Sequence, residues 1–233
     1  MGRLRDLFTR IATGRRARDP VDEKRAAEFA FWEQRAAASP TGTLDSGHYR
    51  DIYTTGFGLP LSFFAGKRFL DIGCGPRGSL EWADMAAERV GLDPLADDYR
   101  SFGTERHAMT YVSSPAERMP FPDASFDVVA TCNSLDHVDD LDATIAEIKR
   151  VSAPGGTLLL ITEVGHQPTP TEPLTFGFEV LDLFAPEFTV DERWDFEMVH
   201  ELVYASLLAA VPYDHDEATP RSGILRARSH RSA

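Results

Sequence analysis

The stretch Phe69-Leu-Asp-Ile-Gly-Cys-Gly-Pro-Arg-Gly-Ser-Leu-Glu81 decides how the rest of the chain is interpreted. It starts with the largely apolar run 68–72, which predicts a buried strand, and then breaks into glycines. Ser79-Leu-Glu-Trp82 predicts the first turn of a helix. A strand that passes through a glycine turn into a helix N-terminus is a frequent ligand-binding arrangement in α/β proteins.

Two cofactors fit this stretch to different degrees. Gly73, Gly75 and Gly78 satisfy the G-x-G-x-x-G spacing, and an acidic residue, Asp93, follows 20 positions after the first glycine, as in a dinucleotide site. Asp71 argues against a dinucleotide, because a carboxylate repels a pyrophosphate and attracts an ammonium. S-adenosylmethionine (SAM) carries an ammonium and a sulfonium and no phosphate. The sequence therefore favours SAM, with Asp93 accepting hydrogen bonds from the ribose hydroxyls.

Composition indicates one domain with additions and disfavours nucleic acid as a partner. The chain has 233 residues and 42% hydrophobic content, which is ample for a core. Its 24 basic and 37 acidic side chains give a net charge of −13, whereas phosphate backbones require a basic face. Residues 1–18 are the exception, with six arginines against one aspartate. We expect a flexible basic arm there, although a membrane or partner contact is an alternative.

Apolar runs and cysteines indicate a cytoplasmic protein. We find no stretch of 18 consecutive apolar residues and no signal-peptide core, so we expect no integral membrane segment. The two cysteines, Cys74 and Cys132, both lie within motif-like stretches and provide no disulfide framework. We interpret both as small buried side chains.

From residue 68 onward, strand-like and helix-like stretches alternate, which predicts a mostly parallel sheet covered by helices on both faces. The clearest helix is expected at Asp139–Ser152, and another at 21–38. A helix is also expected at Met198–Ala210, with Leu202, Leu207 and Leu208 as core candidates. The predicted strands are Arg68–Ile72, Arg89–Leu92, Met109–Val112, Asp127–Thr131 and Thr157–Thr162, followed by an antiparallel C-terminal pair at Phe188–Trp194 and Gly223–Arg228.

Several motifs resemble, in order, those of class I SAM-dependent methyltransferases, and in particular the type-11-like branch that acts on small molecules. The segments are FLDIGCG (69–75), VGLDP (90–94), AERMPFPDASFDVVAT (116–131), NSLDHVDD (133–140) and IKRVSAPGGTLLL (148–160). The resemblance implies a Rossmann-like, seven-stranded α/β fold and SAM as cofactor. The cofactor-binding residues that it implies are Asp71, Gly73, Gly75, Asp93, Ala116, Glu117 and Asn133.

This resemblance also implies a division of the chain. We expect a basic N-terminal arm at 1–20, a helical N-terminal cap at 21–66 and a SAM-binding methyltransferase domain at 67–233. Within that domain, the proline-rich loop near 164–176 is expected to contact the methyl acceptor, because loops beside an active-site mouth commonly bind substrate.

Two positions depart from the family pattern. Pro115 stands where relatives commonly carry an acidic residue that holds the adenine amino group, so the adenine contact must come from the Ala116 backbone, Glu117 or elsewhere. Arg77 replaces a frequent third glycine, with Gly78 displaced by one position. The resulting GCGPRGSLEW is similar to variants among bacterial sugar methyltransferases, which favours a saccharide acceptor.

Methylation of a hydroxyl needs a proton acceptor, and histidine fits by its intrinsic pKa. His137 follows the predicted fourth strand and is the first catalytic candidate, and His166 on the proline-rich loop is the second. Either could instead only shape the pocket. The acidic run Asp136, Asp139, Asp140 and Asp142 suits a helix N-terminus. The alternative is a Mg²⁺ site completed by Glu163 or His166.

The sequence therefore predicts a SAM-dependent methyltransferase that methylates oxygen on a saccharide or a similarly polyhydroxylated metabolite. The alternative within this class is nitrogen methylation of an amino sugar or a small amine. An NAD-dependent oxidoreductase is disfavoured by Asp71 and the later motifs. A non-catalytic SAM-binding protein is disfavoured by the intact motif set.

Overall fold

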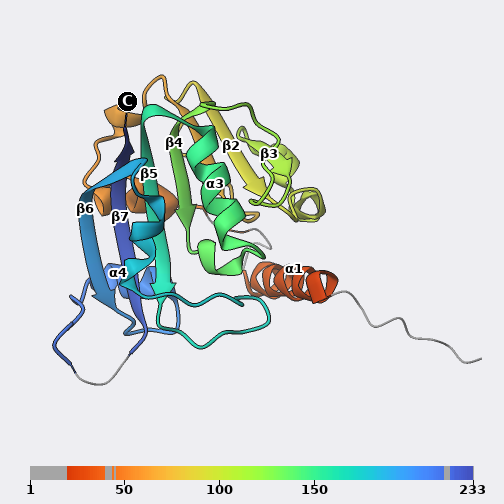
Figure 1. The fold of residues 1–233 in the computed structure, drawn as a ribbon. Coiled ribbons are helices and arrows are strands. Elements are labelled where there is room, and N and C mark those ends of the chain that lie inside the picture. The colour runs from red at the N-terminus through yellow and green to blue at the C-terminus, as the bar shows by residue number, and fades with distance from the viewer. Residues whose placement is uncertain (1–19, 40–43, 45, 218–220, 233) are drawn as a thin grey trace, which may run out of the picture.

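The computed structural model describes residues 20–39, 44, 46–217 and 221–232. Of the predicted basic arm at 1–20, residues 1–19 lie outside the described residues, and Pro20 begins the first helix. A seven-stranded sheet runs through the molecule in the order β3-β2-β1-β4-β5-β7-β6 (Figure 1). The strands are β1 (Arg68–Ile72), β2 (Glu88–Asp93), β3 (Thr110–Ser113), β4 (Phe126–Cys132), β5 (Ser152–Val164), β6 (Phe188–Glu197) and β7 (Gly223–Arg231).

Strand direction agrees with the predicted α/β class. Strands β1 to β5 are parallel to one another, and β7 is antiparallel to both β5 and β6. The mostly parallel sheet with an antiparallel C-terminal pair is therefore confirmed, as are all seven predicted strands to within a few residues at their ends. The prediction succeeded most clearly for β1, β4 and the second half of β5, which are largely apolar and buried, as expected for central strands of a sheet covered on both faces.

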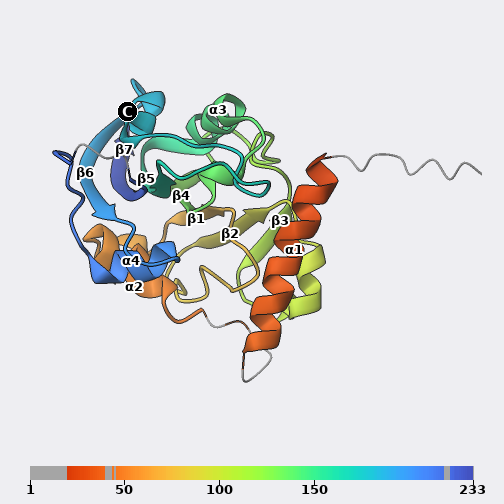
Figure 2. The ribbon, with the colours of Figure 1, turned by 90° about the horizontal axis from the view of Figure 1, so that it is seen from below.

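Helices cover the two faces of the sheet (Figure 2). On one face, α3 (Leu141–Val151) packs with the 3-10 segment Phe178–Phe184, and on the other α2 (Tyr49–Tyr53) lies near α4 (Val203–Ala209). The helix α3 begins where Asp140 accepts a hydrogen bond from the backbone N–H of Ala143. Further 3-10 segments lie at Thr55–Phe57, Leu61–Phe64, Asp98–Phe102, Thr104–Arg106 and Leu135–His137.

The longest helix, α1 (Pro20–Ala38), has no buried residue. Proline at its first position and acidic residues in its first turn suit a helix N-terminus. The helix lies across the carboxyl ends of the parallel strands rather than on either face of the sheet (Figures 1 and 2). Thus the predicted helix at 21–38 is confirmed.

The helix expected to begin at Ser79 does not form. Residues 73–87, all of which are described, are turns and loop. Only residues 79–87 separate the expected helix start from β2, which leaves little room for a helix before the chain enters the sheet. Ser79 donates its hydroxyl hydrogen bond to Asp71 instead of capping a helix.

The prediction for the C-terminal helix was too long. The helix α4 covers only Val203–Ala209 within the expected range of 198–210. Leu207 is buried, but Leu202 and Leu208 are exposed, at 48% and 82%. Those two core predictions were therefore wrong, because Leu202 precedes the helix with extended backbone and Leu208 is on its solvent-facing side.

Apolar side chains form one core on each face of the sheet. Segment 46–66, within the predicted N-terminal cap, contributes Tyr53, Phe57 and Phe64 to the core that also contains β1 and β4 residues. Cys74 and Cys132 are both buried and free, as predicted. Among the described residues, no helix combines the length and apolar character needed to cross a membrane.

Candidate functional site

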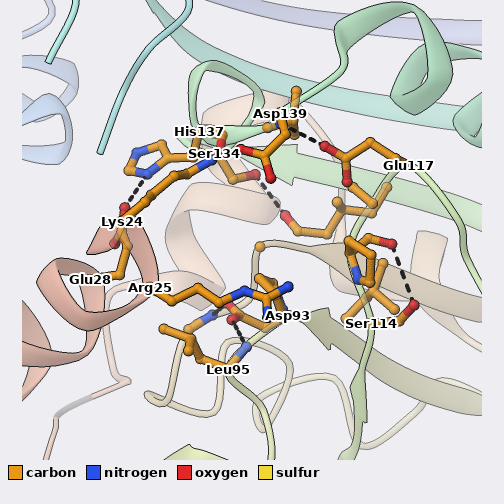
Figure 3. Close-up of a pocket in the computed structure, with 18 of the residues that line it drawn as sticks. Lys24, Arg25, Glu28, Asp93, Leu95, Ser114, Glu117, Ser134, His137 and Asp139 are labelled. Carbon is orange, nitrogen blue, oxygen red and sulfur yellow. Dashed lines mark hydrogen bonds and ion pairs between the residues drawn. The ribbon is translucent and has the colours of Figure 1, made fainter. Parts of the chain in front are cut away.

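A cavity opens at the carboxyl ends of β1, β2 and β4 (Figure 3). Here the strand order reverses, since β2 and β4 lie on opposite sides of β1. Ligands of open α/β sheets typically bind at such a switch point. The helix α1 forms the outer wall of the cavity, and the loops after the three strands form its floor.

Gly73 and Gly75 form the part of the floor that follows β1. Both have positive φ, at 70° and 57°. A Cβ on Gly73 would lie 2.3 Å from the Cβ of Ser134, and one on Gly75 would lie 2.8 Å from the Trp32 ring. Glycine is therefore required here by both backbone conformation and close approach.

Asp93 lies at the end of β2 and lines the cavity. Its carboxylate accepts hydrogen bonds from the backbone N–H of Gly75 at 3.1 Å and of Leu95 at 2.9 Å. Burial raises the pKa of Asp93 to about 6, despite these hydrogen bonds. One carboxylate thus holds the glycine loop and also presents its edge to the cavity.

Asp71, the residue on which the choice of cofactor rests, is buried beneath the glycine loop and is not among the residues that line the cavity. It accepts a hydrogen bond from the Ser79 hydroxyl. Burial raises its pKa to about 7. Asp71 therefore supports the loop from below and places a partly ionised carboxyl group under the cavity floor.

Ala116 and Glu117 line the cavity, with Pro115 beside them. Glu117 lies at the end of the cavity away from the His137 ring (Figure 3). The Glu117 carboxylate accepts hydrogen bonds from the backbone N–H groups of Asp139 and Asp140, at 2.6 and 3.1 Å. Glu117 thus joins this loop to the segment that follows β4.

The contribution of α1 was missed by the sequence analysis. Lys24, Arg25, Glu28 and Trp32 all line the cavity from this helix. Figure 3 shows Arg25 extending from α1 toward Asp93, and Lys24 forms an ion pair with Asp139 at 2.6 Å. The spacing of these residues places them on one helical face. That stripe is readable in the sequence, but nothing in the sequence indicates what it faces.

His137 lines the cavity near Asn133, beyond the end of β4. Its Nδ1 lies 2.6 Å from a carboxylate oxygen of Glu28 (Figure 3). Burial lowers the pKa of His137, but Glu28 and the neighbouring acids outweigh this and raise it to about 8. The Asn133 backbone has a positive φ of 56°, which asparagine tolerates better than most residues.

Outside the main cavity, three more side chains gather near His137. The His137 Nε2 lies 3.9 Å from Asp136 and 3.7 Å from Glu172, and the Nε2 of His166 lies 3.6 Å from Asp136. The loop after β5 thus brings His166 beside the segment that carries His137. The two histidine candidates therefore belong to one cluster, although His166 is not among the residues lining the main cavity.

The acidic run at 136–142 does not converge on one point. Asp139 pairs with Lys24, and Asp140 caps α3. Asp142 lies in the first turn of that helix. The helix-start interpretation thus holds for these three residues, and the Mg²⁺ set built from them was wrong. Only Asp136 turns toward the histidines.

A second cavity opens at the same edge of the sheet, beyond the ends of β5 and β6. Charged side chains predominate in its wall, among them Glu163, Glu197 and Arg221. Burial raises the pKa of Glu163. The edge of the sheet next to the histidine cluster is therefore polar rather than apolar.

Comparison with known proteins shows which families this chain resembles in sequence. Residues 70–160 match the family described as "Methyltransferase domain". Sterol 4-C-methyltransferase strm-1 of Caenorhabditis elegans is 35% identical over 99 residues, which cover 39% of this chain and 29% of that protein. The UbiE ubiquinone/menaquinone C-methyltransferase of Shewanella piezotolerans is 45% identical over 89 residues, which cover 37% of this chain and 34% of that protein. The matched segments thus span about a third of either relative.

A solved structure extends the likeness at the level of fold. The SAM-dependent methyltransferase from Mesorhizobium loti superimposes with a TM-score of 0.54 and 18% identity, covering 74% of this chain and 94% of that one. The fold is thus a Rossmann-like α/β fold that this chain shares with that methyltransferase. Residues 70–160 are in addition similar in sequence to a methyltransferase domain.

Proposed function

We propose that the protein transfers the methyl group of SAM to a hydroxyl oxygen of a saccharide or another polyhydroxylated small molecule. The observation that carries the choice of acceptor is the cluster of Asp136, His137, His166 and Glu172 at one end of the cavity. Carboxylates and imidazoles hydrogen-bond hydroxyl groups well. An apolar acceptor bound beside these side chains would remove water from them and leave their polar atoms without hydrogen-bond partners.

In this proposal SAM lies along the cavity floor. Asp93 accepts hydrogen bonds from the ribose hydroxyls, and Ala116 and Glu117 border the adenine. Gly73 and Gly75 allow the methionine portion to approach the backbone, with the Asp71 carboxylate beneath it. The sulfonium then lies toward Asn133 and His137, because adenine occupies the opposite end of the cavity.

Methyl transfer requires an acceptor oxygen in line with the methyl–sulfur bond. The oxygen forms a bond to the methyl carbon as the carbon–sulfur bond breaks, and the electron pair remains on sulfur. Above about pH 8, where the His137 ring is neutral, the hydroxyl proton passes to its Nε2, while its Nδ1 faces Glu28. The loop at 164–176 holds the acceptor against this edge and carries His166, the second candidate for the proton.

The relatives named above act, by their names, on sterol and quinone carbon. The acidic character of the cluster also suits an ammonium group, so nitrogen methylation of an amino sugar or small amine remains the second candidate. The predicted cytoplasmic location and the absence of a nucleic-acid partner stay predictions from sequence.

The direct test is release of S-adenosylhomocysteine across panels of saccharide, amine and lipid acceptors. We expect turnover with a polyhydroxylated acceptor, and turnover confined to lipid acceptors would overturn the proposal. Calorimetry with SAM and with NAD distinguishes a methyltransferase from an NAD-dependent oxidoreductase, since we expect only SAM to bind. Binding of SAM with no turnover on any acceptor would favour a non-catalytic SAM-binding protein.

Substitution of His137 by Ala tests the residue assignment. We expect kcat on a hydroxyl acceptor to fall by about 10²- to 10⁴-fold, the usual contribution of a positioned proton acceptor. SAM affinity, measured by calorimetry, should change little. His230→Ala is the matched control, because His230 is on β7 and pairs with Asp191. A fewfold loss of kcat with strongly weakened SAM binding would instead indicate a pocket-shaping role.

A further inference from the structure

We infer that Asp136, His137, His166 and Glu172 bind one divalent first-row transition-metal ion, of the kind represented by Zn²⁺, Mn²⁺ or Co²⁺. The four residues come from two segments that meet at the edge of the sheet. Asp136 and His137 lie in the 3-10 turn after β4, and His166 and Glu172 lie in the loop after β5. A hydrogen bond from the Leu174 N–H to the Asp136 carbonyl joins the two segments.

Buried atoms without hydrogen-bond partners point to a missing ligand. Asp136 Oδ1, His137 Nε2 and His166 Nε2 are all buried and lack a partner. The side chains of Asp136 and His166 are only 2% and 7% exposed. Buried polar groups are almost always hydrogen-bonded, and an unpaired carboxylate is costly to bury. Three such atoms gathered around the Asp136 carboxylate therefore indicate that something polar or charged belongs there.

The separations fit coordination better than direct hydrogen bonding. The atoms of Asp136, His137 and Glu172 that could act as ligands lie within 4.8 Å of one another. The contacts of 3.6 to 3.9 Å are too long for hydrogen bonds. Two ligand atoms that each lie about 2.0–2.2 Å from one ion are roughly 3 to 4.4 Å apart. A single ion can therefore bind Asp136, His137 and Glu172 with small shifts, and His166, whose Nε2 lies 3.6 Å from Asp136, joins as the fourth ligand.

Outer hydrogen bonds hold three of these side chains with their free atoms inward. His137 has its Nδ1 on Glu28 at 2.6 Å, and His166 has its Nδ1 on the Gln167 carbonyl at 3.0 Å. Glu172 accepts a hydrogen bond from the Thr169 hydroxyl through Oε2, which leaves Oε1 toward His137. Metal-binding histidines commonly donate their second ring N–H to a carboxylate or carbonyl in this way.

The ligand types select the class of ion. Two imidazole nitrogens and two carboxylates suit Zn²⁺, Mn²⁺ or Co²⁺, whereas Mg²⁺ and Ca²⁺ prefer oxygen ligands alone. A divalent ion also neutralises the two carboxylates, which otherwise share a largely buried space. This set differs from the Mg²⁺ site considered from the sequence, because Asp139, Asp140 and Asp142 take no part in it.

The chemical role of the ion rests on the proposed function, whereas the binding of the ion does not. An ion at this place would bind a hydroxyl oxygen of the acceptor and lower the pKa of that hydroxyl. The lone pair of His137 would then serve coordination, and proton removal would no longer depend on it. Metal binding itself is independent of any activity and is measured directly.

The experiment uses the full chain without a polyhistidine tag, freed of metal with a chelator and then titrated with Co²⁺. We expect one Co²⁺ per chain, visible absorption bands from the bound ion, and displacement by Zn²⁺ but not by excess Mg²⁺. Asp136→Asn and His166→Ala should weaken Co²⁺ binding at least tenfold. Glu28→Gln, which changes only the partner of His137, should weaken it by about 10- to 100-fold.

Controls separate loss of the site from loss of the fold. Glu172→Gln, on a partly exposed loop residue, covers the case in which Asp136→Asn fails to fold. His230→Ala should bind Co²⁺ like the wild type. Absence of stoichiometric binding, or equal binding by the Asp136, His166 and Glu172 variants, would overturn the metal site. Methyl transfer at full rate in chelated, metal-free protein would overturn its role while leaving the proposed function intact. Metal binding with no turnover on any acceptor would overturn the proposed function and leave the metal site intact.

Discussion

Asp93 illustrates how one side chain can serve the fold and the ligand together. Its two oxygens hold the backbone of Gly75 and Leu95, and its edge faces the cavity. In the isosteric variant Asp93→Asn, one oxygen remains as an acceptor but the charge is lost. We expect SAM to bind about 10- to 150-fold more weakly, because a hydrogen bond to a charged group contributes roughly 1.5–3 kcal/mol.

Isothermal titration calorimetry at fixed pH measures this change. Asp97→Asn is the control, since Asp97 is exposed on the same loop and pairs with Arg100. Its SAM affinity should match that of the wild type. Unchanged affinity in Asp93→Asn, with the melting temperature preserved, would remove Asp93 from the ribose role.

At the level of elements, α1 stands apart from the rest of the fold. None of its residues is buried, yet it covers the cavity and contributes Glu28 to His137. Its other contacts include the Lys24–Asp139 ion pair and the Phe29 ring, which lies 5.3 Å from Phe102. A helix held by so few apolar contacts should open more readily than the sheet.

Hydrogen exchange tests whether SAM holds α1 in place. If SAM binds only beneath the docked helix, a concentration of 100 times Kd adds about 2.7 kcal/mol to its opening, and exchange slows by about 100-fold. Amides of β7, which lies beyond β5 in the sheet, provide the internal control. Equal exchange of α1 with and without SAM would contradict this coupling.

At the level of the whole molecule, buried carboxylates make stability depend on pH. The pKa of Asp71 rises from 3.8 to about 7 in the folded state. Between these values the folded state binds more protons than the unfolded state, so stability falls as pH rises from about 4 to 7. Asp93 acts in the same direction, whereas the lowered pKa values of Asp127 and Glu147 act in the opposite one.

Urea unfolding of the wild type and Asp71→Asn, at pH 5 and pH 7.5 without SAM, isolates this contribution. The wild type should lose about 2–3 kcal/mol more than the variant between the two pH values. The asparagine can still accept the Ser79 hydrogen bond. An equal loss in both proteins would show that another group carries the pH dependence.

Local sequence signals were sufficient for the sheet but not for everything around it. Apolar runs located the central strands β1, β4 and β5, and the glycines with Asp93 marked the cavity floor. The missing helix at Ser79 was decided by loop length and hydrogen bonding to Asp71, which a helix-start pattern does not reveal. The approach of Glu28 to His137 spans 109 positions, so it depends on tertiary contact alone.

The position of β7 has a consequence for how the chain folds. This strand follows every other strand in sequence, yet it lies between β5 and β6 and pairs with both. Until residues 223–231 have been synthesised, β5 has an open edge and β6 has no partner in the sheet. Open edges are templates for wrong pairing between chains. During synthesis, the polypeptide therefore passes through an aggregation-prone stage just before this strand enters the sheet.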